Sequence, residues 1–248
     1  MMVRRYAAAA LALALGLGAA LTTSTLCAQE TKNPAVKPLN RDNDRHKKFL
    51  QIVAKGEADV IFIGDSITQG WEGAGKKAWA DHFAPLKAVN LGIGGDQTGH
   101  VLWRITEGKE LEPIKPKVAV MMIGTNNTGQ HTAEQIAGGI KAIIEELHKQ
   151  KPEMKILLLG VFPRAGGIKK EDTAAPPEKL NSKIKAINEI IAKYDDGKTV
   201  FYKDIGAVFL ESDGSLSRKV MPDLLHLSPE AYDRWAMAIK DDVVKLLK

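Results

Sequence analysis

Cysteine is almost absent from this chain of 248 residues, and its only occurrence is Cys27. A single thiol excludes an internal disulfide and a cysteine-based zinc site. The histidines and acidic residues show no metal-ligand spacing either, so the sequence predicts no metal and no other cofactor. A domain of roughly 200 residues buries enough apolar surface to fold without such links.

Long apolar runs are also lacking. The Ala- and Leu-rich run at residues 7–21 is shorter than the ~20 residues that a membrane-spanning helix needs. It follows Arg4 and Arg5 and precedes a small, polar stretch, which is the order of regions in a secretory signal peptide. We therefore predict a signal peptide at residues 1–28, export to the periplasm or the extracellular space, and no stable membrane insertion after cleavage. An uncleaved anchor is the alternative; a lipoprotein at Cys27 is disfavoured because Leu26 precedes it.

A basic patch is the third missing feature. The chain has 35 Lys and Arg against 30 Asp and Glu, a net charge of +5. Without Arg4 and Arg5 the counts are 33 and 30, which leaves +3. The lysines are scattered, with no alternation of basic and aromatic residues. This pattern favours a solvated surface and argues against a nucleic-acid partner.

The rest of the chain alternates short apolar runs with longer amphipathic ones. Residues 29–44 are polar and contain Pro34 and Pro38, so we predict a tether ahead of a single domain at residues 45–248. The predicted strands are residues 59–63, 88–91, 118–123, 155–161 and 199–202. The predicted helices are residues 41–55, 132–150 and 180–194, and a last helix that begins at Ser228.

This order of elements predicts the fold class. Alternating strands and helices, with strands that are apolar almost throughout, are typical of a parallel sheet covered by helices on both faces. We therefore expect an α/β protein with a five-stranded parallel sheet in a three-layer αβα sandwich. In open sheets of this kind, functional sites form beyond the carboxyl ends of the strands.

Three short polar motifs follow the first three predicted strands. They are Gly64-Asp65-Ser66, the stretch NLGIGGD at residues 90–96, and Gly124-Thr125-Asn126-Asn127. Each alone is also what an ordinary strand-ending turn would contain. Together they would bring a serine, backbone amides beside glycines and a side-chain amide to one sheet edge, which are the parts of a nucleophile and an oxyanion hole.

A general base is supplied near the C-terminus. Asp223 and His226 stand three residues apart, just ahead of the last helix. At this spacing the carboxylate can fix the imidazole tautomer, which leaves the other ring nitrogen to accept a serine proton. His100, His131 and His148 have no acidic residue at that local spacing. A capped turn is the plainer reading of Asp223 and His226 when the three strand-end motifs are left aside.

These blocks resemble the GDSL or SGNH hydrolase family. Its four signature residues match Ser66 in GDSIT, a glycine in NLGIGGD, Asn126 in GTNN and His226 in DLLH. The similarity extends from about residue 59 to 248 and is greatest to the catalytic alpha subunits of intracellular platelet-activating factor acetylhydrolase, through NLGIGGD, VLWR at residues 101–104, and GTNN. The resemblance implies a flavodoxin-like sheet and selects Gly95 as the oxyanion glycine, where the residues alone left Gly92, Gly94 and Gly95 open.

The sequence thus predicts an exported carboxylic ester hydrolase. We expect a catalytic triad of Ser66, Asp223 and His226, an oxyanion hole formed by Ser66, Gly95 and Asn126, and an acyl-enzyme intermediate. Small acyl groups, acetyl first, are what the resemblance implies; the leaving group is a carbohydrate or a lipid-like alcohol. The expected substrate pocket includes Ile67, Asn127, His131 and Leu225, with residues 163–177 as a lid, a wall or a solvated loop.

Several alternatives stay open at this point. A non-catalytic binding module on the same scaffold would keep the fold but lose a triad residue. A lysophospholipase or thioesterase would accept a broader range of acyl chains. A flavodoxin-like redox protein is disfavoured, because no phosphate-binding loop rich in Ser and Thr follows the first strand. A homodimer is neither indicated nor excluded.

Overall fold

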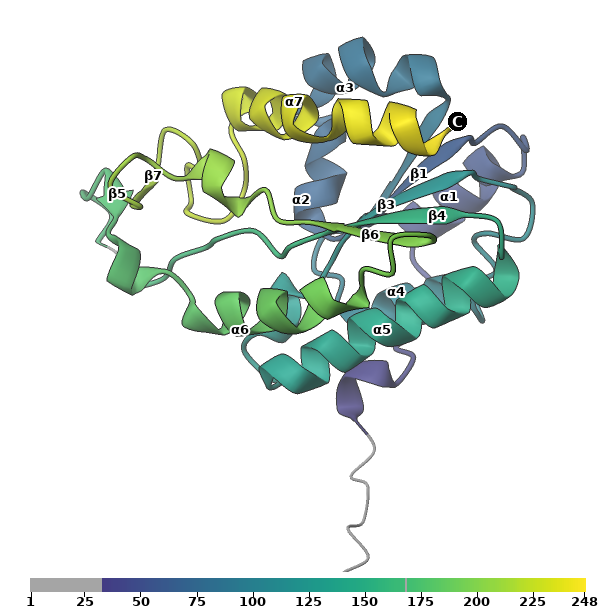
Figure 1. Cartoon of the computed structure of the whole chain (residues 1–248), viewed down its shortest axis with the longest axis horizontal. Coiled ribbons are helices and arrows are strands. Elements are labelled where there is room, and N and C mark those ends of the chain that lie inside the picture. The colour runs from purple at the N-terminus through teal and green to yellow at the C-terminus, as the bar shows by residue number, and fades with distance from the viewer. Residues whose placement is uncertain (1–32, 168) are drawn as a thin grey trace, which may run out of the picture. The chain divides into compact units, whose positions relative to one another are not determined.

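The computed structural model describes residues 33–167 and 169–248 (Figure 1). The predicted signal peptide at residues 1–28 lies outside the described residues. Residues Asn33–Lys248 form one compact unit.

Five parallel strands form the central sheet. They are β1 (Val60–Gly64), β2 (Ala88–Gly92), β3 (Val118–Met122), β4 (Lys155–Leu159) and β6 (Val200–Lys203). Their order is β2-β1-β3-β4-β6, which is the flavodoxin-like arrangement with a topological switch point beside β1. The predicted fold class and all five predicted strands are therefore confirmed, with shifts of one or two residues at most ends.

Helices cover both faces of this sheet. One face carries α1 (Asp44–Val53), α4 (Thr98–Ile105), α5 (Ala133–Gln150) and α6 (Ser182–Ile191), and the other carries α3 (Lys76–His82) and α7 (Pro229–Leu246) (Figure 1). The four-residue α2 (Ser66–Gln69) follows β1 directly. Single 3-10 turns are η1 (Pro34–Val36), η2 (Gly70–Glu72), η3 (Ala84–Leu86), η4 (Thr125–Asn127), η5 (Pro177–Lys179), η6 (Ala192–Tyr194) and η7 (Gly206–Phe209).

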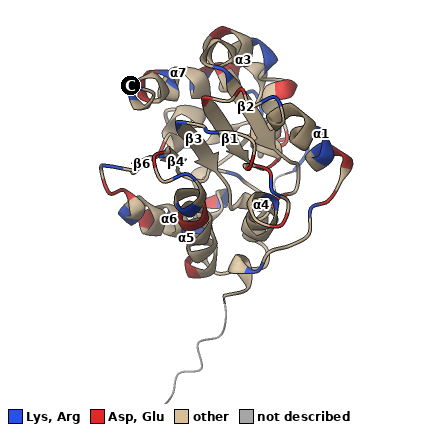
Figure 2. Cartoon of the chain, turned by 90° about the vertical axis from the view of Figure 1, so that its right-hand side faces the viewer, with Lys and Arg blue, Asp and Glu red and all other residues tan. Residues whose placement is uncertain are grey.

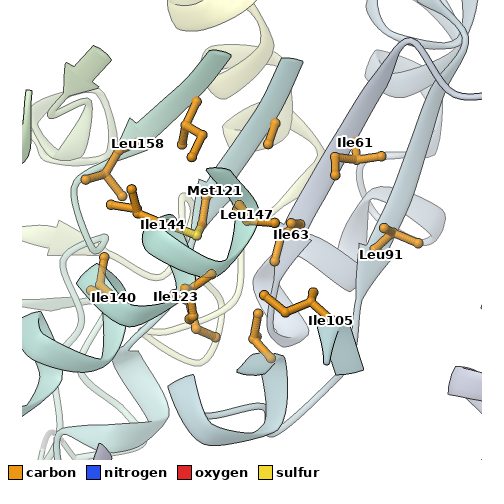
Figure 3. Packing of buried hydrophobic residues seen from close by; sticks show 14 of the residues in the cluster. Ile61, Ile63, Leu91, Ile105, Met121, Ile123, Ile140, Ile144, Leu147 and Leu158 are labelled. Carbon is orange, nitrogen blue, oxygen red and sulfur yellow. The ribbon is translucent and has the colours of Figure 1, made fainter. Parts of the chain in front are cut away.

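Alternation along each strand builds two cores. In β1, Ile61 and Ile63 face the α4 and α5 side, whereas Val60 and Phe62 face the α7 side. Figure 3 shows the first core, where aliphatic side chains of β1, β3 and β4 meet those of α4 and α5. The second core is aromatic: Trp71 packs 4.7 Å from both Tyr232 and Trp235 of α7, measured between ring centroids. Helices thus cover both faces of the sheet, so we expect a site at the edge formed by the strand ends.

The described part of the predicted tether is not free. Ala35 is buried, the Thr98 hydroxyl donates a hydrogen bond to its carbonyl oxygen at 2.7 Å, and the Asn33 side-chain amide donates to the Gln135 carbonyl oxygen at 2.8 Å. Asn33, Ala35 and Leu39 of the segment predicted as a tether at residues 29–44 thus contact α4 and α5. These contacts come from single side chains and carbonyls, which leave no periodic pattern in the sequence.

Residues 163–177 follow β4 at the carboxyl edge of the sheet. Part of this segment is ordered by β5 (Ala174–Ala175), which pairs antiparallel with β7 (Leu216–Ser217), and Ala165 is bridged to Leu180. The segment is therefore built into the protein surface between β4 and the C-terminal loops.

Charges of both signs are interspersed on the helices and loops, while the strands carry few of them (Figure 2). Of the helices that the structure describes, none combines the length and the apolar character that crossing a bilayer requires.

Candidate active site

Ser66 lies just beyond the carboxyl end of β1 and is the first residue of α2. Asp65 caps α2 by accepting a hydrogen bond from the Ile67 amide at 2.9 Å, so Ser66 becomes the first residue of that helix. Gly64 makes this sharp turn feasible, because a Cβ there would come within 2.0 Å of the Thr68 hydroxyl and 2.5 Å of the Met122 carbonyl oxygen. The GDS motif therefore fixes a half-buried serine hydroxyl at the sheet edge.

Asp65 itself is fully buried. One of its carboxylate oxygens caps α2, and the other has no hydrogen-bond partner among the described residues. Burial raises the pKa of Asp65 to about 7, although the hydrogen bond from Ile67 acts in the opposite direction. One oxygen of Asp65 therefore locks the turn as a hydrogen-bond acceptor, and the elevated pKa follows from burial that the sequence does not indicate.

The imidazole of His226 lies between Ser66 and Asp223. Its Nε2 is 2.8 Å from the Ser66 hydroxyl oxygen, and its Nδ1 is 2.6 Å from a carboxylate oxygen of Asp223. The second oxygen of Asp223 accepts hydrogen bonds from the amides of Leu225 and His226 at 3.1 and 2.7 Å. The Asp-x-x-His spacing is thus a closed local turn, which orients the ring from both its backbone and its Nδ1.

Two further features hold this turn. Partial burial acts to raise the pKa of Asp223, but the hydrogen bonds from the ring and backbone of His226 outweigh it and leave the pKa below its usual value. Leu224 adopts φ +60°, a left-handed conformation that costs a non-glycine residue about 1–2 kcal/mol. Its side chain is buried in the aromatic core, and this anchor offsets the strain.

The loop after β2 leaves one glycine amide free. The Gly92 amide donates to the Asn90 side chain at 2.9 Å, and the Gly94 amide donates to the Gln69 side chain at 2.7 Å. Among the described residues, the amides of Gly95 and Ser66 have no protein acceptor. Gly95 is also the exposed member of the loop and has φ +80°, which favours glycine. Of the three glycines that the sequence left open, only Gly95 has a free amide.

Asn126 and Asn127 have different environments. Asn126 is half-buried in η4, and its side-chain amide donates to the Asp96 carbonyl oxygen at 3.0 Å, which joins the loops after β2 and β3. Asn127 is fully buried and exchanges hydrogen bonds with Thr98 at 3.1 Å. The first asparagine therefore faces the sheet edge, and the second ties η4 to α4.

Two arginines hold Asp96 from opposite sides. Arg41 Nε lies 2.7 Å from one carboxylate oxygen, and Arg104 Nε lies 2.9 Å from the other. Arg41 also donates to the Gly94 carbonyl oxygen, and Arg104 extends the network to Glu110 at 2.5 Å. Asp96 thus locks the loop after β2 through two ion pairs, and no local motif in the sequence indicates the Arg41 partner.

The expected substrate pocket needs correction. Ile67 is 1% exposed in the aromatic core and Asn127 is 0% exposed, so neither can offer a wall to a substrate. Each neighbours a signature residue, but its side chain points into the fold. His131 and Leu225 are half-buried and remain available. His100 accepts a hydrogen bond from the Gln97 amide through its Nδ1 and closes the capping box of α4. This nitrogen is therefore engaged in the helix cap.

A cavity of about 740 Å³ lies elsewhere, between α6, β6 and η7. Its walls include Ile184, Tyr202 and Leu210, and Ser66 and His226 do not contribute to it. The hydrogen-bonded group of Ser66, His226 and Asp223 therefore lies outside this cavity. In the described part of the chain, no group of three or more His, Cys, Asp or Glu residues is arranged to hold a metal ion.

Comparison with known proteins places the chain in a class. The profile of the GDSL-like lipase/acylhydrolase family matches residues 62–234. Platelet-activating factor acetylhydrolase IB subunit alpha2 of Gallus gallus is 38% identical over 225 residues, which cover 87% of this chain and 93% of the relative. The alpha1 subunit of Homo sapiens is 37% identical over 225 residues, which cover 87% and 92%.

A solved structure of a GDSL-like lipase from Bacteroides thetaiotaomicron shares the fold, with a TM-score of 0.58 and 21% identity over 81% of this chain and 97% of that one. The fold, the sheet-edge motifs and these similarities define a hydrolase that acts on esters. The chain belongs to the GDSL-like lipase/acylhydrolase family.

Proposed function

We propose that the protein is a serine esterase that works through an acyl-enzyme intermediate. Ser66 Oγ attacks the ester carbonyl carbon while its proton passes to His226 Nε2. The tetrahedral intermediate then expels the alkoxide of the alcohol, which takes that proton from His226. Water attacks the acyl-Ser66 ester by the same route and releases the acid.

Asp223 orients the base in this scheme. Its carboxylate accepts a hydrogen bond from the Nδ1–H of His226, which leaves Nε2 as the acceptor for the serine proton. When Nε2 takes up that proton, the imidazolium is stabilised by the adjacent negative charge. The lowered pKa of Asp223 supports this role, because the carboxylate stays ionised at the pH at which the base works.

The oxyanion is held by three donors. The amides of Ser66 and Gly95 are without protein acceptors among the described residues, and Asn126 carries a side-chain amide beside them. In the ground state Asn126 donates to Asp96, and its second amide hydrogen is available to the oxyanion. Such preorganised donors stabilise the charge that develops in the transition state.

The acyl group is small, with acetyl first. The relatives support an acetyl group, because they are acetylhydrolase subunits whose sequences are 37–38% identical to this one. The leaving group is a carbohydrate or a lipid-like alcohol. Export through the signal peptide predicted at residues 1–28 favours the carbohydrate, and the named relatives favour the lipid-like alcohol.

The observation that carries the proposal is the unbroken relay from Ser66 through His226 to Asp223, at 2.8 and 2.6 Å. The test is a panel of para-nitrophenyl esters of rising acyl length, together with acetylated xylan. We expect turnover to be greatest for acetyl and to fall with length, and to disappear in Ser66→Ala. Equal rates for long chains would favour a lysophospholipase or thioesterase, and no turnover of any ester would favour a binding module.

A further inference from the structure

Arg164 is fixed beside both loops of the proposed site. It follows β4, and its carbonyl oxygen accepts a hydrogen bond from the Asn181 amide at 2.9 Å. The next amide, of Ala165, donates to the Leu224 carbonyl oxygen at 3.1 Å, and Leu224 lies between Asp223 and His226 in the chain. The backbone of Arg164 is therefore pinned to the turn that carries the proposed base.

The guanidinium of Arg164 reaches the opposite loop. Its Nη1 lies 3.3 Å from the Thr125 hydroxyl oxygen and 3.4 Å from the Thr125 carbonyl oxygen, one residue before Asn126. Its charge also reaches the residue before Ser66: burial raises the pKa of Asp65, and Arg164 is among the charges that oppose this rise. The cation thus lies close to the loops of the nucleophile, the base and the oxyanion donor.

Within residues 33–167 and 169–248, no carboxylate forms an ion pair with Arg164. Only Nη1 has protein acceptors, and both contacts are long, whereas a guanidinium offers five N–H donors. A half-buried arginine normally finds a carboxylate or phosphate for its planar fork. Its remaining donors are therefore available to a ligand.

A second cation strengthens the positive potential of this edge. Lys183 Nζ lies 2.6 Å from the Thr128 carbonyl oxygen and 2.8 Å from that of His131. It too is held by carbonyl oxygens of the loop that follows η4. In the described structure neither Arg164 nor Lys183 is neutralised by an ion pair, and the loop at residues 125–131 contains no acidic residue.

We propose that Arg164 binds a negatively charged group on the alcohol portion of the ester, so that the preferred substrates are small-acyl esters of anionic alcohols. The inference rests on the proposed function, because it concerns the leaving group of that reaction. The leaving oxygen takes its proton from His226, so the alcohol lies on the His226 side of the reacting carbon. Arg164 extends from this turn, where the neighbouring Ala165 amide donates to the Leu224 carbonyl oxygen, to Thr125, beside which its guanidinium lies. A carboxylate or phosphate that extends from the leaving group toward Thr125 meets the guanidinium donors.

The experiment compares two acetate esters that differ in charge. Para-acetoxybenzoate carries a carboxylate, and para-acetoxybenzamide has the same acyl group and shape without the charge. We expect the ratio of their kcat/KM values to favour the anion in the wild type, and to fall about tenfold or more in Arg164→Gln, mainly through KM, because a contact made before and during reaction acts on binding. Arg164→Lys should keep part of the preference, and added salt should lower it in the wild type.

Arg234→Gln is the matched control, because it removes one arginine charge on α7, where Arg234 pairs with Glu230. It should leave the ratio unchanged. Equal use of both esters by the wild type, or an equal loss on both esters in Arg164→Gln, would overturn the proposal and leave Arg164 as a clamp on Thr125. Hydrolysis of the neutral ester separates this failure from that of the proposed function: if it survives in Ser66→Ala, the proposed function itself is wrong.

Discussion

Ser66 and His226 lie 160 positions apart in the chain, yet the Ser66 hydroxyl oxygen is 2.8 Å from His226 Nε2. The contact joins the end of β1 to the turn that precedes α7. Tyr232, on the first turn of α7, donates a hydrogen bond to the Ile67 carbonyl oxygen at 2.6 Å and fastens the same two elements. The proposed nucleophile and base are thus held by helices that pack on the sheet.

Asn126→Ala should lower kcat by about 10²–10³-fold, equivalent to ~2.7–4 kcal/mol, because one preorganised oxyanion donor is lost. KM should change little, because the donor acts on charge that develops only in the transition state, and the thermal midpoint should fall only modestly with the lost hydrogen bond to Asp96. Asn127→Ala is the informative comparison: it removes the buried contact with Thr98 and should lower stability more than it lowers kcat at a temperature where it is folded. Undiminished turnover of Asn126→Ala would remove that residue from the oxyanion hole.

The rate should depend on pH through the base. His226 must be neutral to accept the Ser66 proton, so kcat/KM should fall as the solution is acidified. Asp223→Asn should lower kcat by less than the ~10⁴-fold known for a buried triad aspartate, because the Asp223 side chain is 54% exposed and water can replace it in part. A pH-rate profile of the wild type that is flat from about pH 5 to 8 would exclude a histidine base.

Arg41 should matter for turnover although it is remote from the nucleophile in sequence. It contacts both the Asp96 carboxylate and the Gly94 carbonyl oxygen, and so fixes the backbone on both sides of Gly95. Arg41→Gln should therefore lower kcat by about tenfold, because a misplaced donor stabilises the oxyanion less. Lys47→Gln removes an exposed charge nearby and serves as the control. Equal kcat values for the two variants would show that the Gly95 loop holds its shape without Arg41.

Asp65 should make stability depend on pH. Its pKa is raised by burial to about 7, so the folded protein keeps a proton that the unfolded chain loses above its ordinary value near 3.8. The contribution of Asp65 to the free energy of unfolding is therefore most favourable below that value and falls as the pH rises toward 7, by at most about 4 kcal/mol.

Asp65→Asn isolates this effect, because the amide oxygen can still cap α2 while the proton is no longer exchanged. Urea unfolding at pH 4, 5.5 and 7.5 should show a free energy that falls more steeply with pH in the wild type than in the variant. Parallel curves would mean that Asp65 is ionised in the folded protein at neutral pH.

Much of the fold was predictable because its signals are local. The strands are short apolar runs, and the helix at residues 133–150 carries both a helical repeat of isoleucines and a capping box that the structure contains. The helix at residues 98–105 was missed for a physical reason. It is only eight residues long, and all of its residues except His100 are buried, so it offers too few turns for a helical repeat to stand out in the sequence.

The candidate site was predictable only where a residue lies in a recognisable local motif. Ser66 and Asn126 lie in motifs at strand ends, and Asp223 and His226 lie in a motif just ahead of the last helix. The free amide of Gly95 agrees with the family pattern. Arg41 and Arg164 come from segments without periodicity, and their partners are distant in sequence. Ile67 and Asn127 were expected in the substrate pocket because each is adjacent to a signature residue. Their side chains are instead buried in the fold, since adjacency in sequence does not determine which way a side chain points.

The most direct test of the central claim is covalent labelling of the nucleophile. A small alkyl fluorophosphonate, which phosphonylates activated serines, should add to one site, and peptide mass spectrometry should locate the adduct on Ser66. Labelling and para-nitrophenyl acetate hydrolysis should both be lost in Ser66→Ala. His226→Ala should react with the fluorophosphonate far more slowly than the wild type. An enzyme that hydrolyses the ester while Ser66 stays unmodified, or a Ser66→Ala variant that retains full turnover, would contradict the account.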